Sequence, residues 1–394
     1  MHIRLPVFLV ATLLVASAPA HAAATTPLWT PVIPGVPRPE GATFMMLNDV
    51  AATSSSDVWA VGTASGNASQ AVSAHWNGTD WNLVPTPEIS EFEYNLEAID
   101  TLSTQDVWTV GHGRPAGSGW DIPTTAIVGR YDGAAWSVVP TPPPAAGISQ
   151  MLTDVDMVST ADGWIVGWTA GSALAGPESW QPSAMRWQNG QWVRTAVPSL
   201  PGGNAMLNAV HARSATDVWA VGSHGNAALV MHWDGVQWSQ VGVPHGVPAE
   251  AGNVLWAVTA VSATEVWAVG TTCVWDDAGG TATCQPLAMR LSGGGWQLVP
   301  TAGDGGTQLT DVVARSADDV WVVGYEGPVL GQEEANHVEH WDGQRFTTVP
   351  APSAGGMLLG ALASALQAAI VIPGTDVLWA VGWQDNDAQV IRYG

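Results

Sequence analysis

The chain has 394 residues, of which 46% are hydrophobic and only 11% are charged, and its formal net charge is −23 at pH 7. All 11 basic residues are arginines, and they are outnumbered by 34 acidic residues. Such a chain repels phosphate backbones and anionic lipid head groups, so we expect neither nucleic acids nor membrane surfaces as partners. Cations, basic peptides and neutral glycans are compatible with this charge.

The first 22 residues have the pattern of a secretory signal peptide. Arg4 precedes an apolar run from Leu5 to Val15, which leads to the cleavage pattern Ala20-His21-Ala22. We therefore expect cleavage after Ala22 and a secreted, extracellular protein formed by residues 23–394. No later apolar run approaches the ~20 residues that span a bilayer, so no membrane insertion is expected.

A hexapeptide close to D-V-W-A-V-G returns along the chain. Its tryptophans lie 48 to 58 residues apart, at Trp59, Trp108, Trp164, Trp219, Trp267, Trp321 and Trp379. A period of about fifty residues is typical of one blade of a β-propeller.

Each repeat predicts four short strands in chain order. Strand A reads L-x-x-V, as in residues 47–50, and strand B is D-V-W-A-V-G, whose apolar residues alternate. Strand C ends in His-Trp or a variant, and an Asp-Gly or Asn-Gly dipeptide then turns a tight hairpin. Strand D is W-x-x-V-P, with a proline where outer pairing stops.

The two ends of the chain predict a closed ring. The last repeat stops after its strand C, at residues 392–394, and lacks a strand D. Residues 27–34, PLWTPVIP, resemble the strand D sequence DWNLVPTP at 80–87. We therefore expect residues 23–394 to form a single all-β domain, a seven-bladed β-propeller with four-stranded antiparallel blades. Residues 27–34 would be the outer strand of its last blade and would remove the open edge.

These repeats resemble kelch repeats, which also combine a hydrophobic strand ending in glycine, a turn containing aspartate, and W-x-x-L/V-P. They are also similar to BNR and Ycf48-type propeller repeats through the D-G…W turn. The resemblance covers nearly all of residues 23–394 and implies a secreted bacterial seven-bladed propeller.

Acidic and basic residues occupy matching positions in the repeats. An acid begins every strand B and a base stands near the end of every strand C, which lie opposite each other in an antiparallel hairpin. We interpret them as structural ion pairs, and a ring of ligand sites is the alternative. The expected pairs are Asp57 with His75, Asp106 with Arg130, Asp162 with Arg186, Asp217 with His232, Glu265 with Arg290, Asp319 with His340, and Asp376 with Arg392.

The segments between strands B and C vary most, from 9 to 19 residues. They leave from the same face as the D–A connections, and loops on a rigid scaffold usually carry function. Six tryptophans lie outside the repeat motifs, and all except Trp256 are in B–C segments. Aromatic side chains there suit sugar rings or peptide anchors, and packing over the core is the alternative. The candidate ligand-binding residues are Trp275, Trp120, Trp180, Trp168, Trp383, Asp276 and Asp277.

Cys273 and Cys284 frame the 12-residue segment CVWDDAGGTATC. In an exported chain we expect one disulfide between them, because the spacing does not fit a CxxC metal or redox pair. The acidic residues of this face offer oxygen ligands for Ca²⁺, although a solvated acidic surface is the alternative. No other cofactor is expected.

The sequence contains no H-E-x-x-H, G-x-S-x-G, phosphate-loop or dinucleotide motif. We therefore expect a monomeric, non-catalytic binding module with an extracellular glycan or protein as its partner. The first hypothesis is carbohydrate recognition by the loop tryptophans, and the second is a protein- or peptide-docking scaffold. The third is a glycan hydrolase or lyase that uses carboxylates from separate blades.

Overall fold

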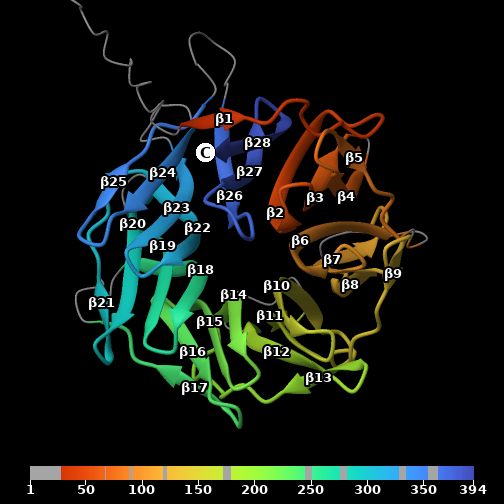
Figure 1. The fold of residues 1–394 in the computed structure, drawn as a ribbon. Coiled ribbons are helices and arrows are strands. Elements are labelled where there is room, and N and C mark those ends of the chain that lie inside the picture. Colours follow the sequence, from red (N-terminus) through yellow and green to blue (C-terminus); the bar gives the residue numbers. More distant parts are fainter. Residues whose placement is uncertain are drawn as a thin grey trace, which may run out of the picture.

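The structure is a computed structural model that describes residues 28–66, 68–87, 89, 92–118, 122–171, 179–244, 251–275, 282–327, 334–353 and 363–394. The described residues form 28 β-strands and no α-helix. The strands build seven four-stranded sheets arranged as blades around a common axis (Figure 1). The expected seven-bladed propeller is confirmed.

In the first four blades, strands A to D follow one another in sequence. The first blade contains β2 (Phe44–Ser54), β3 (Asp57–Ser65), β4 (Ser69–Trp76) and β5 (Trp81–Leu83). The second contains β6 (Phe92–Ser103), β7 (Asp106–Pro115), β8 (Thr125–Tyr131) and β9 (Trp136–Val138). The third contains β10 (Ser149–Ser159), β11 (Asp162–Ala170), β12 (Gln181–Gln188) and β13 (Gln191–Thr195). The fourth contains β14 (Ala205–Ser214), β15 (Asp217–His224), β16 (Ala227–Trp233) and β17 (Trp238–Val241).

The fifth and sixth blades repeat this order, and the seventh takes its outer strand from the start of the described chain. The fifth contains β18 (Gly252–Ser262), β19 (Glu265–Trp275), β20 (Ala282–Ser292) and β21 (Gly295–Leu298). The sixth contains β22 (Thr307–Ser316), β23 (Asp319–Glu326), β24 (Ala335–Trp341) and β25 (Phe346–Thr348). The seventh contains β26 (Ser364–Val371), β27 (Leu378–Gln384), β28 (Asp387–Tyr393) and β1 (Trp29–Pro31).

Pairing between β1 and β28 closes the ring. Trp29 lies opposite Tyr393 and Pro31 lies opposite Ile391, in an antiparallel register. In Figure 1 the red strand β1 lies beside the blue strands of the last blade. The expected closure is confirmed, and it covers the edge of β28 that would otherwise remain unpaired.

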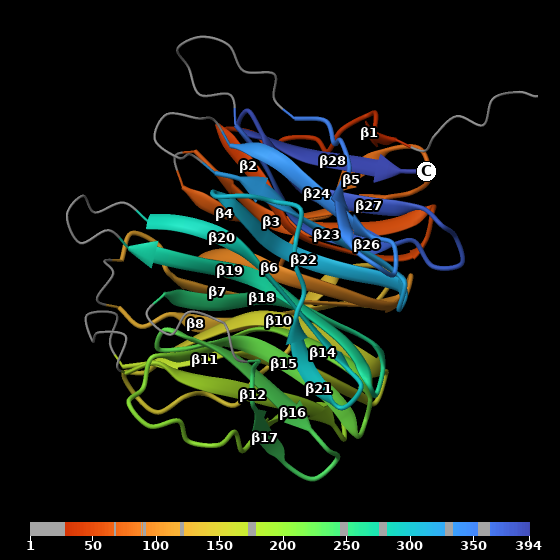
Figure 2. The ribbon, with the colours of Figure 1, turned by 90° about the vertical axis from the view of Figure 1, so that its left-hand side faces the viewer.

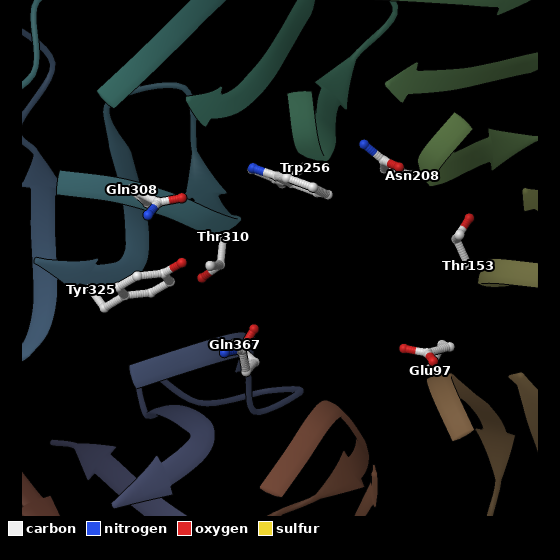
Figure 3. Close-up of a pocket in the computed structure, with 8 residues that line it drawn as sticks. All are labelled: Glu97, Thr153, Asn208, Trp256, Gln308, Thr310, Tyr325 and Gln367. Carbon is white, nitrogen blue, oxygen red and sulfur yellow. The ribbon is translucent and has the colours of Figure 1, made fainter. Parts of the chain in front are cut away.

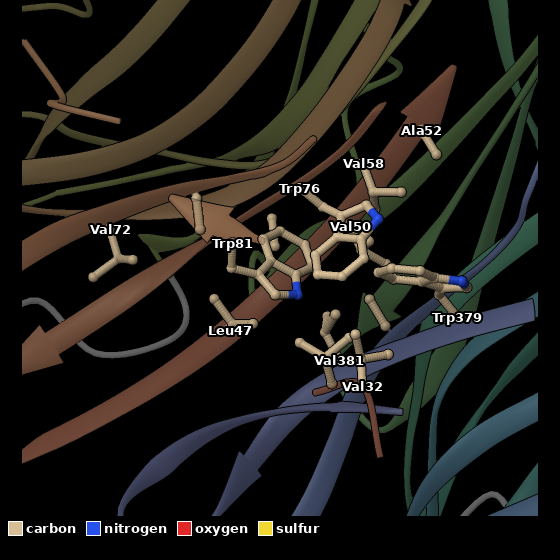
Figure 4. Close-up of a cluster of buried hydrophobic side chains, with 14 of the residues drawn as sticks. Val32, Leu47, Val50, Ala52, Val58, Val72, Trp76, Trp81, Trp379 and Val381 are labelled. Atoms are coloured by element: carbon tan, nitrogen blue, oxygen red, sulfur yellow. The ribbon is translucent and has the colours of Figure 1, made fainter. Parts of the chain in front are cut away.

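Aromatic side chains fill the space between neighbouring blades. Trp379, from strand B of the last blade, lies with its ring centroid 5.6 Å from that of Trp76 and 6.0 Å from that of Trp81 in the first blade (Figure 4). The same contact between a strand-B tryptophan and aromatic residues of the following blade recurs around the ring. Each such pair contributes about 0.5–1.5 kcal/mol beyond the area it buries. The repeated tryptophans therefore hold the blades to one another.

The glycine that ends D-V-W-A-V-G is required by a close backbone approach. Strand A bulges opposite this glycine, so that a Cβ atom on Gly222 would lie 2.1 Å from the carbonyl oxygen of Met206. At Gly270 it would lie 2.0 Å from the carbonyl oxygen of Val254. No side chain fits at this distance, so the repeated glycine and the repeated bulge belong together.

Successive antiparallel strands reverse direction, so each kind of connection stays on one face of the ring. We call the face with the B–C and D–A connections the loop face, as at Gly225-Asn226 between β15 and β16, and the opposite one the turn face. Figure 2 shows the ring from the side, with the strands crossing its thickness. Within the described ranges, no helix is long and apolar enough to cross a membrane.

Serine side chains support the turns between strands A and B. In the fourth blade the Oγ atom of Ser214 accepts a hydrogen bond from the backbone N–H of Thr216 over 3.3 Å. Equivalent bonds link Ser103 to Gln105 and Ser316 to Asp318. Such local bonds hold a tight turn and set where strand B begins.

Candidate functional site

Every strand A has one bulged residue at the same position. In all seven blades the register shifts directly after the strand A leucine, so that the next residue has no partner in strand B. A bulge redirects a side chain and occurs often beside functional sites. The bulged residues are Asn48, Glu97, Thr153, Asn208, Trp256, Thr310 and Gln367.

Six of these bulged residues surround a cavity of about 350 Å³ in the centre of the ring. Gln308 and Tyr325, which pair with each other at the loop-face ends of β22 and β23, complete the lining. Figure 3 shows the eight side chains around one opening. The cavity thus occupies the part of the central channel nearer the loop face.

One part of the lining connects neighbouring blades. The Nδ2 atom of Asn208 donates to the carbonyl oxygen of Leu255 over 2.8 Å. The hydroxyl of Thr153 donates to the carbonyl oxygen of Leu207 over 2.9 Å. In the same way, the hydroxyl of Thr310 in the sixth blade donates to the carbonyl oxygen of Leu366 in the seventh blade over 2.9 Å. These side chains satisfy carbonyl groups on the inner edges of the sheets, where strand A has no further neighbour.

The other part of the lining keeps its polar groups unused. No hydrogen bond to another described residue engages the amides of Gln308 and Gln367, the hydroxyl of Tyr325 or the indole N–H of Trp256. Trp256 is 41% exposed, although it lies on an inner strand. Burial raises the pKa of Tyr325, and the charge of Glu334 raises it further, so the phenol keeps its proton. This side of the cavity therefore offers an aromatic face beside unpaired donors and acceptors.

Glu97 is the carboxylic acid of the lining. Its Oε1 atom lies 3.5 Å from the Nδ1 atom of His112, and its Oε2 atom accepts a 3.4 Å hydrogen bond from Asn48. Burial raises the pKa of Glu97. Burial also lowers the pKa of His112, and the nearby charge of Arg114 lowers it further. Because its pKa is lowered, His112 is neutral at neutral pH and does not compensate the charge of Glu97.

Five aspartates line the inner strands farther toward the turn face. Each accepts a 2.7 Å hydrogen bond from a backbone N–H of the following blade, as Asp49 does from Ile99 and Asp154 does from Val210. These bonds satisfy donors on the open inner edges and join the blades. The five are Asp49, Asp100, Asp154, Asp156 and Asp311.

Enclosure within the ring raises the pKa of these carboxyl groups. Burial, together with the charges of Asp311 and Asp100, raises the pKa of Asp49 to about 8. Burial and the charge of Asp156 raise the pKa of Asp100 to about 7. The pKa values of Asp156 and Asp311 rise to about 6, and that of Asp154 rises well above its ordinary value, in each case chiefly through burial. At neutral pH Asp49 therefore largely keeps its proton, and Asp100 keeps its proton in part.

The acid–base pairs expected from the repeats lie at the turn face, away from this cavity. Their basic side chains also cover strand-B tryptophans, as His75 does at 4.4 Å from Trp59 and Arg186 at 5.4 Å from Trp164. In the first six blades each acidic side chain thus has its partner within its own blade. The pairs in contact are Asp57 with His75 at 2.6 Å, Asp106 with Arg130 and Asp162 with Arg186 at 2.7 Å, Asp217 with His232 at 2.9 Å, Glu265 with Arg290 at 2.5 Å, and Asp319 with His340 at 2.9 Å.

The expected pair of Asp376 with Arg392 is wrong. In the described part of the chain no ion pair joins them, and the Asp376 side chain is fully exposed, 4.0 Å from Arg315 of the sixth blade. The cause is the longer A–B turn of the last blade, in which Val371 pairs with Leu378 and Asp376 stays in the loop. The inserted residues shift the acid out of strand B.

The tryptophans expected to bind a ligand are partly packed against one another. The rings of Trp168 and Trp180 lie 4.8 Å apart, and the ring of Trp383 lies 5.9 Å from Phe44. All three tryptophans are half-buried. Trp275 ends β19 opposite Ala282, but its side chain lies outside the description, as do Trp120, Asp276 and Asp277 entirely. The binding role of these residues stays a prediction.

The disulfide between Cys273 and Cys284 is present, and it joins residues directly opposite each other in β19 and β20. Among the residues that the structure describes, no group of three or more histidine, cysteine, aspartate or glutamate side chains is arranged to hold a metal ion. Asp276 and Asp277 are outside those residues, so the calcium hypothesis stays a prediction.

The sequence interpretation did not assign Trp256 to the site. Its neighbours in the cavity come from the same bulged position of other repeats, which is polar in most blades although the strand is otherwise apolar. The recurring polar residue directly after the strand A leucine is the sequence feature that could have indicated this site. The contribution of Gln308 and Tyr325 depends on a register that the sequence does not show.

Comparisons with known proteins agree with the fold. No family model matches the chain, and no curated protein matches it. A solved structure of YCF48 bound to D1 peptide is 14% identical, covers 96% of this chain and 97% of its own, and has a TM-score of 0.54. YCF48 from Cyanidioschyzon merolae is 14% identical, covers 93% of this chain and 98% of its own, and has a TM-score of 0.52. At this identity the similarity establishes a shared propeller fold over nearly the whole chain.

Proposed function

We propose that this chain is a non-catalytic docking protein that binds a segment of another polypeptide at the loop-face end of its central channel. The observation that carries the proposal is the exposed ring of Trp256 beside the unpaired groups of Gln308, Gln367 and Tyr325. A peptide backbone presents alternating N–H and C=O groups, which primary amides and hydroxyls match. An exposed tryptophan supplies a large rigid anchor for an apolar part of the partner.

Two further points support docking. One structural neighbour of the same fold, YCF48, is seen bound to a peptide. The cavity combines residues from six different blades, so its surface can change from protein to protein without changing the repeated scaffold. The proposal keeps the extracellular setting expected from residues 1–22 and from the disulfide.

Carbohydrate recognition is the second candidate. The half-buried Trp168 and Trp180 lie at the loop face with their rings tilted by 31°, where an aromatic surface could hold a sugar ring. A hydrolase is less well supported, because glycosidases use two carboxyl groups and only Glu97 contributes one to the described lining.

Binding of the full chain to matched panels of short unstructured peptides and of soluble glycans separates the two candidates. Docking predicts saturable peptide binding that weakens at least about tenfold in Trp256→Ala, since tryptophan anchors often contribute about 2 kcal/mol or more. Trp180→Ala is the matched control and should leave the peptide affinity unchanged. Glycan binding that is lost in Trp180→Ala and kept in Trp256→Ala would instead establish the carbohydrate hypothesis and refute docking in the channel.

A further inference from the structure

Glu97 is the one carboxylic acid among the described residues that line the channel cavity. The chain has no lysine, and no arginine is among the described residues that line the cavity. Arg130, Arg186 and Arg290 are held in ion pairs at the turn face. Within the described lining, no arginine or lysine therefore neutralises Glu97.

Neutral histidines leave the negative charges in place. His211 lies 3.6 Å from Asp156, but burial lowers its pKa, as it does for His112 beside Glu97. The aspartates beneath the cavity add little charge near neutral pH, because burial raises the pKa of Asp49 to about 8 and that of Asp100 to about 7. The carboxylate of Glu97, in a chain whose formal net charge is −23, therefore attracts a cation to this end of the channel.

The other side of the cavity suits a flat cation. The ring of Trp256 is exposed, and the face of an indole attracts a guanidinium group more strongly than other aromatic rings do. The amide oxygens of Gln308 and Gln367 are free to accept hydrogen bonds from other molecules, as far as the described residues show. A guanidinium group stacks on an aromatic face while its N–H fork bonds to carboxylate or amide oxygens, which a lysine ammonium group does less well.

We propose that the cavity receives an arginine side chain of the docked segment, whose positive charge is attracted by Glu97 and whose guanidinium group faces Trp256. This inference rests on the docking function proposed above and names the chemistry that the channel selects.

The test compares matched peptides that differ at one residue. Peptides of one unstructured sequence carry arginine, lysine or the neutral isostere citrulline at the centre, and their affinities for the full chain are measured by calorimetry. We expect the arginine peptide to bind at least about tenfold more tightly than the citrulline peptide, which corresponds to ~1.4 kcal/mol. The lysine peptide should bind more weakly than the arginine peptide, and the arginine preference should shrink as salt screens the charges.

Two variants test whether Glu97 causes the preference for the arginine peptide. Glu97→Gln should lower the arginine-to-citrulline affinity ratio toward one. Glu40→Gln, which changes an exposed glutamate outside the cavity, is the control and should keep the wild-type ratio. Because the peptide comparison uses the unchanged protein, it remains decisive even if Glu97→Gln folds poorly.

Different failures have different meanings. Equal binding of the arginine and citrulline peptides, with both weakened by Trp256→Ala, would overturn arginine selection but leave the docking function standing. An arginine preference that survives in Glu97→Gln would overturn the placement of the cation. Absence of binding by every peptide would contradict both the docking function and the inference drawn from it.

Discussion

Deleting residues 27–34 is expected to lower the free energy of unfolding of the whole ring by about 4 kcal/mol or more, because it removes a buried tryptophan and exposes a strand edge. Trp29 is only 4% exposed and packs on Trp321 at 6.1 Å and on Tyr393 at 5.6 Å, between ring centroids. The N–H of Val32 continues the pairing by donating to the carbonyl oxygen of Val390 over 3.0 Å. These contacts close the last blade and join it to the sixth blade.

Chemical denaturation of the chain with and without residues 27–34 measures this effect. Removal of residues 1–22 alone is the control, and Trp29→Ala separates the buried side chain from the strand pairing. We expect Trp29→Ala to be destabilising by about 3–5 kcal/mol and the full deletion to exceed it. Equal stability with and without residues 27–34 would show that β1 does not hold the ring closed.

Stability is expected to fall by about 2–4 kcal/mol as the pH rises from about 6.5 to about 8.5. Folding raises the pKa of Asp49 to about 8 and that of Asp100 to about 7, so the folded ring retains protons that the unfolded chain has released. When a folded chain binds more protons than the unfolded chain, its stability falls as the pH rises. Asp154 acts in the same direction, because its pKa is also raised.

His337 also makes the stability fall as the pH rises, so its effect must be measured separately from that of the aspartates. Burial disfavours its charge, but hydrogen bonds of 2.8 Å to Glu339 and Glu326 outweigh burial and raise its pKa. Its stabilising effect is therefore complete below the ordinary histidine pKa and is lost as the pH rises through the folded value. His112 and His211 have lowered pKa values and stay neutral in both states above about pH 6.5.

Thermal unfolding at several pH values, for the wild type and three variants, provides the measurement. Asp49→Ala should flatten the pH dependence, and His337→Gln should remove only the part due to the histidine. Asp132→Ala is the matched control, because backbone hydrogen bonds from Ala135 and Ala134 lower the pKa of that exposed carboxyl and it titrates below this range. Stability that stays constant or increases with pH would contradict burial of the channel aspartates as acids.

The fold could be predicted because its determinants repeat. The same tryptophan, glycine and turn residues occur in each unit, so their spacing indicated the blades, and the similarity of residues 27–34 to strand D indicated the closure. The prediction of the ion pairs failed in the last blade, which departs from the repeat pattern. The longer turn before Leu378 moved Asp376 out of strand B, and alignment of motifs alone could not show this.

The cavity was harder to predict because it forms at the axis, where residues far apart in the sequence meet. Glu97 and Trp256 are brought to one opening only by the ring geometry. The bulges that turn these side chains inward lie opposite the motif glycines, where the two backbones approach closely. One sequence could not show that the glycines are needed for this close approach. Exposed loop tryptophans were the more visible signal, yet Trp168 and Trp180 contact each other.

The most direct test of docking in the channel is photo-crosslinking with a bound peptide that carries a benzophenone group, followed by identification of the modified residues by mass spectrometry. Docking in the channel predicts adducts on β18, β22, β23 and β26, including Trp256 and Tyr325, and their loss when unlabelled peptide competes. Competed adducts confined to the outer strands, or to the neighbouring Trp168 and Trp180, would contradict it.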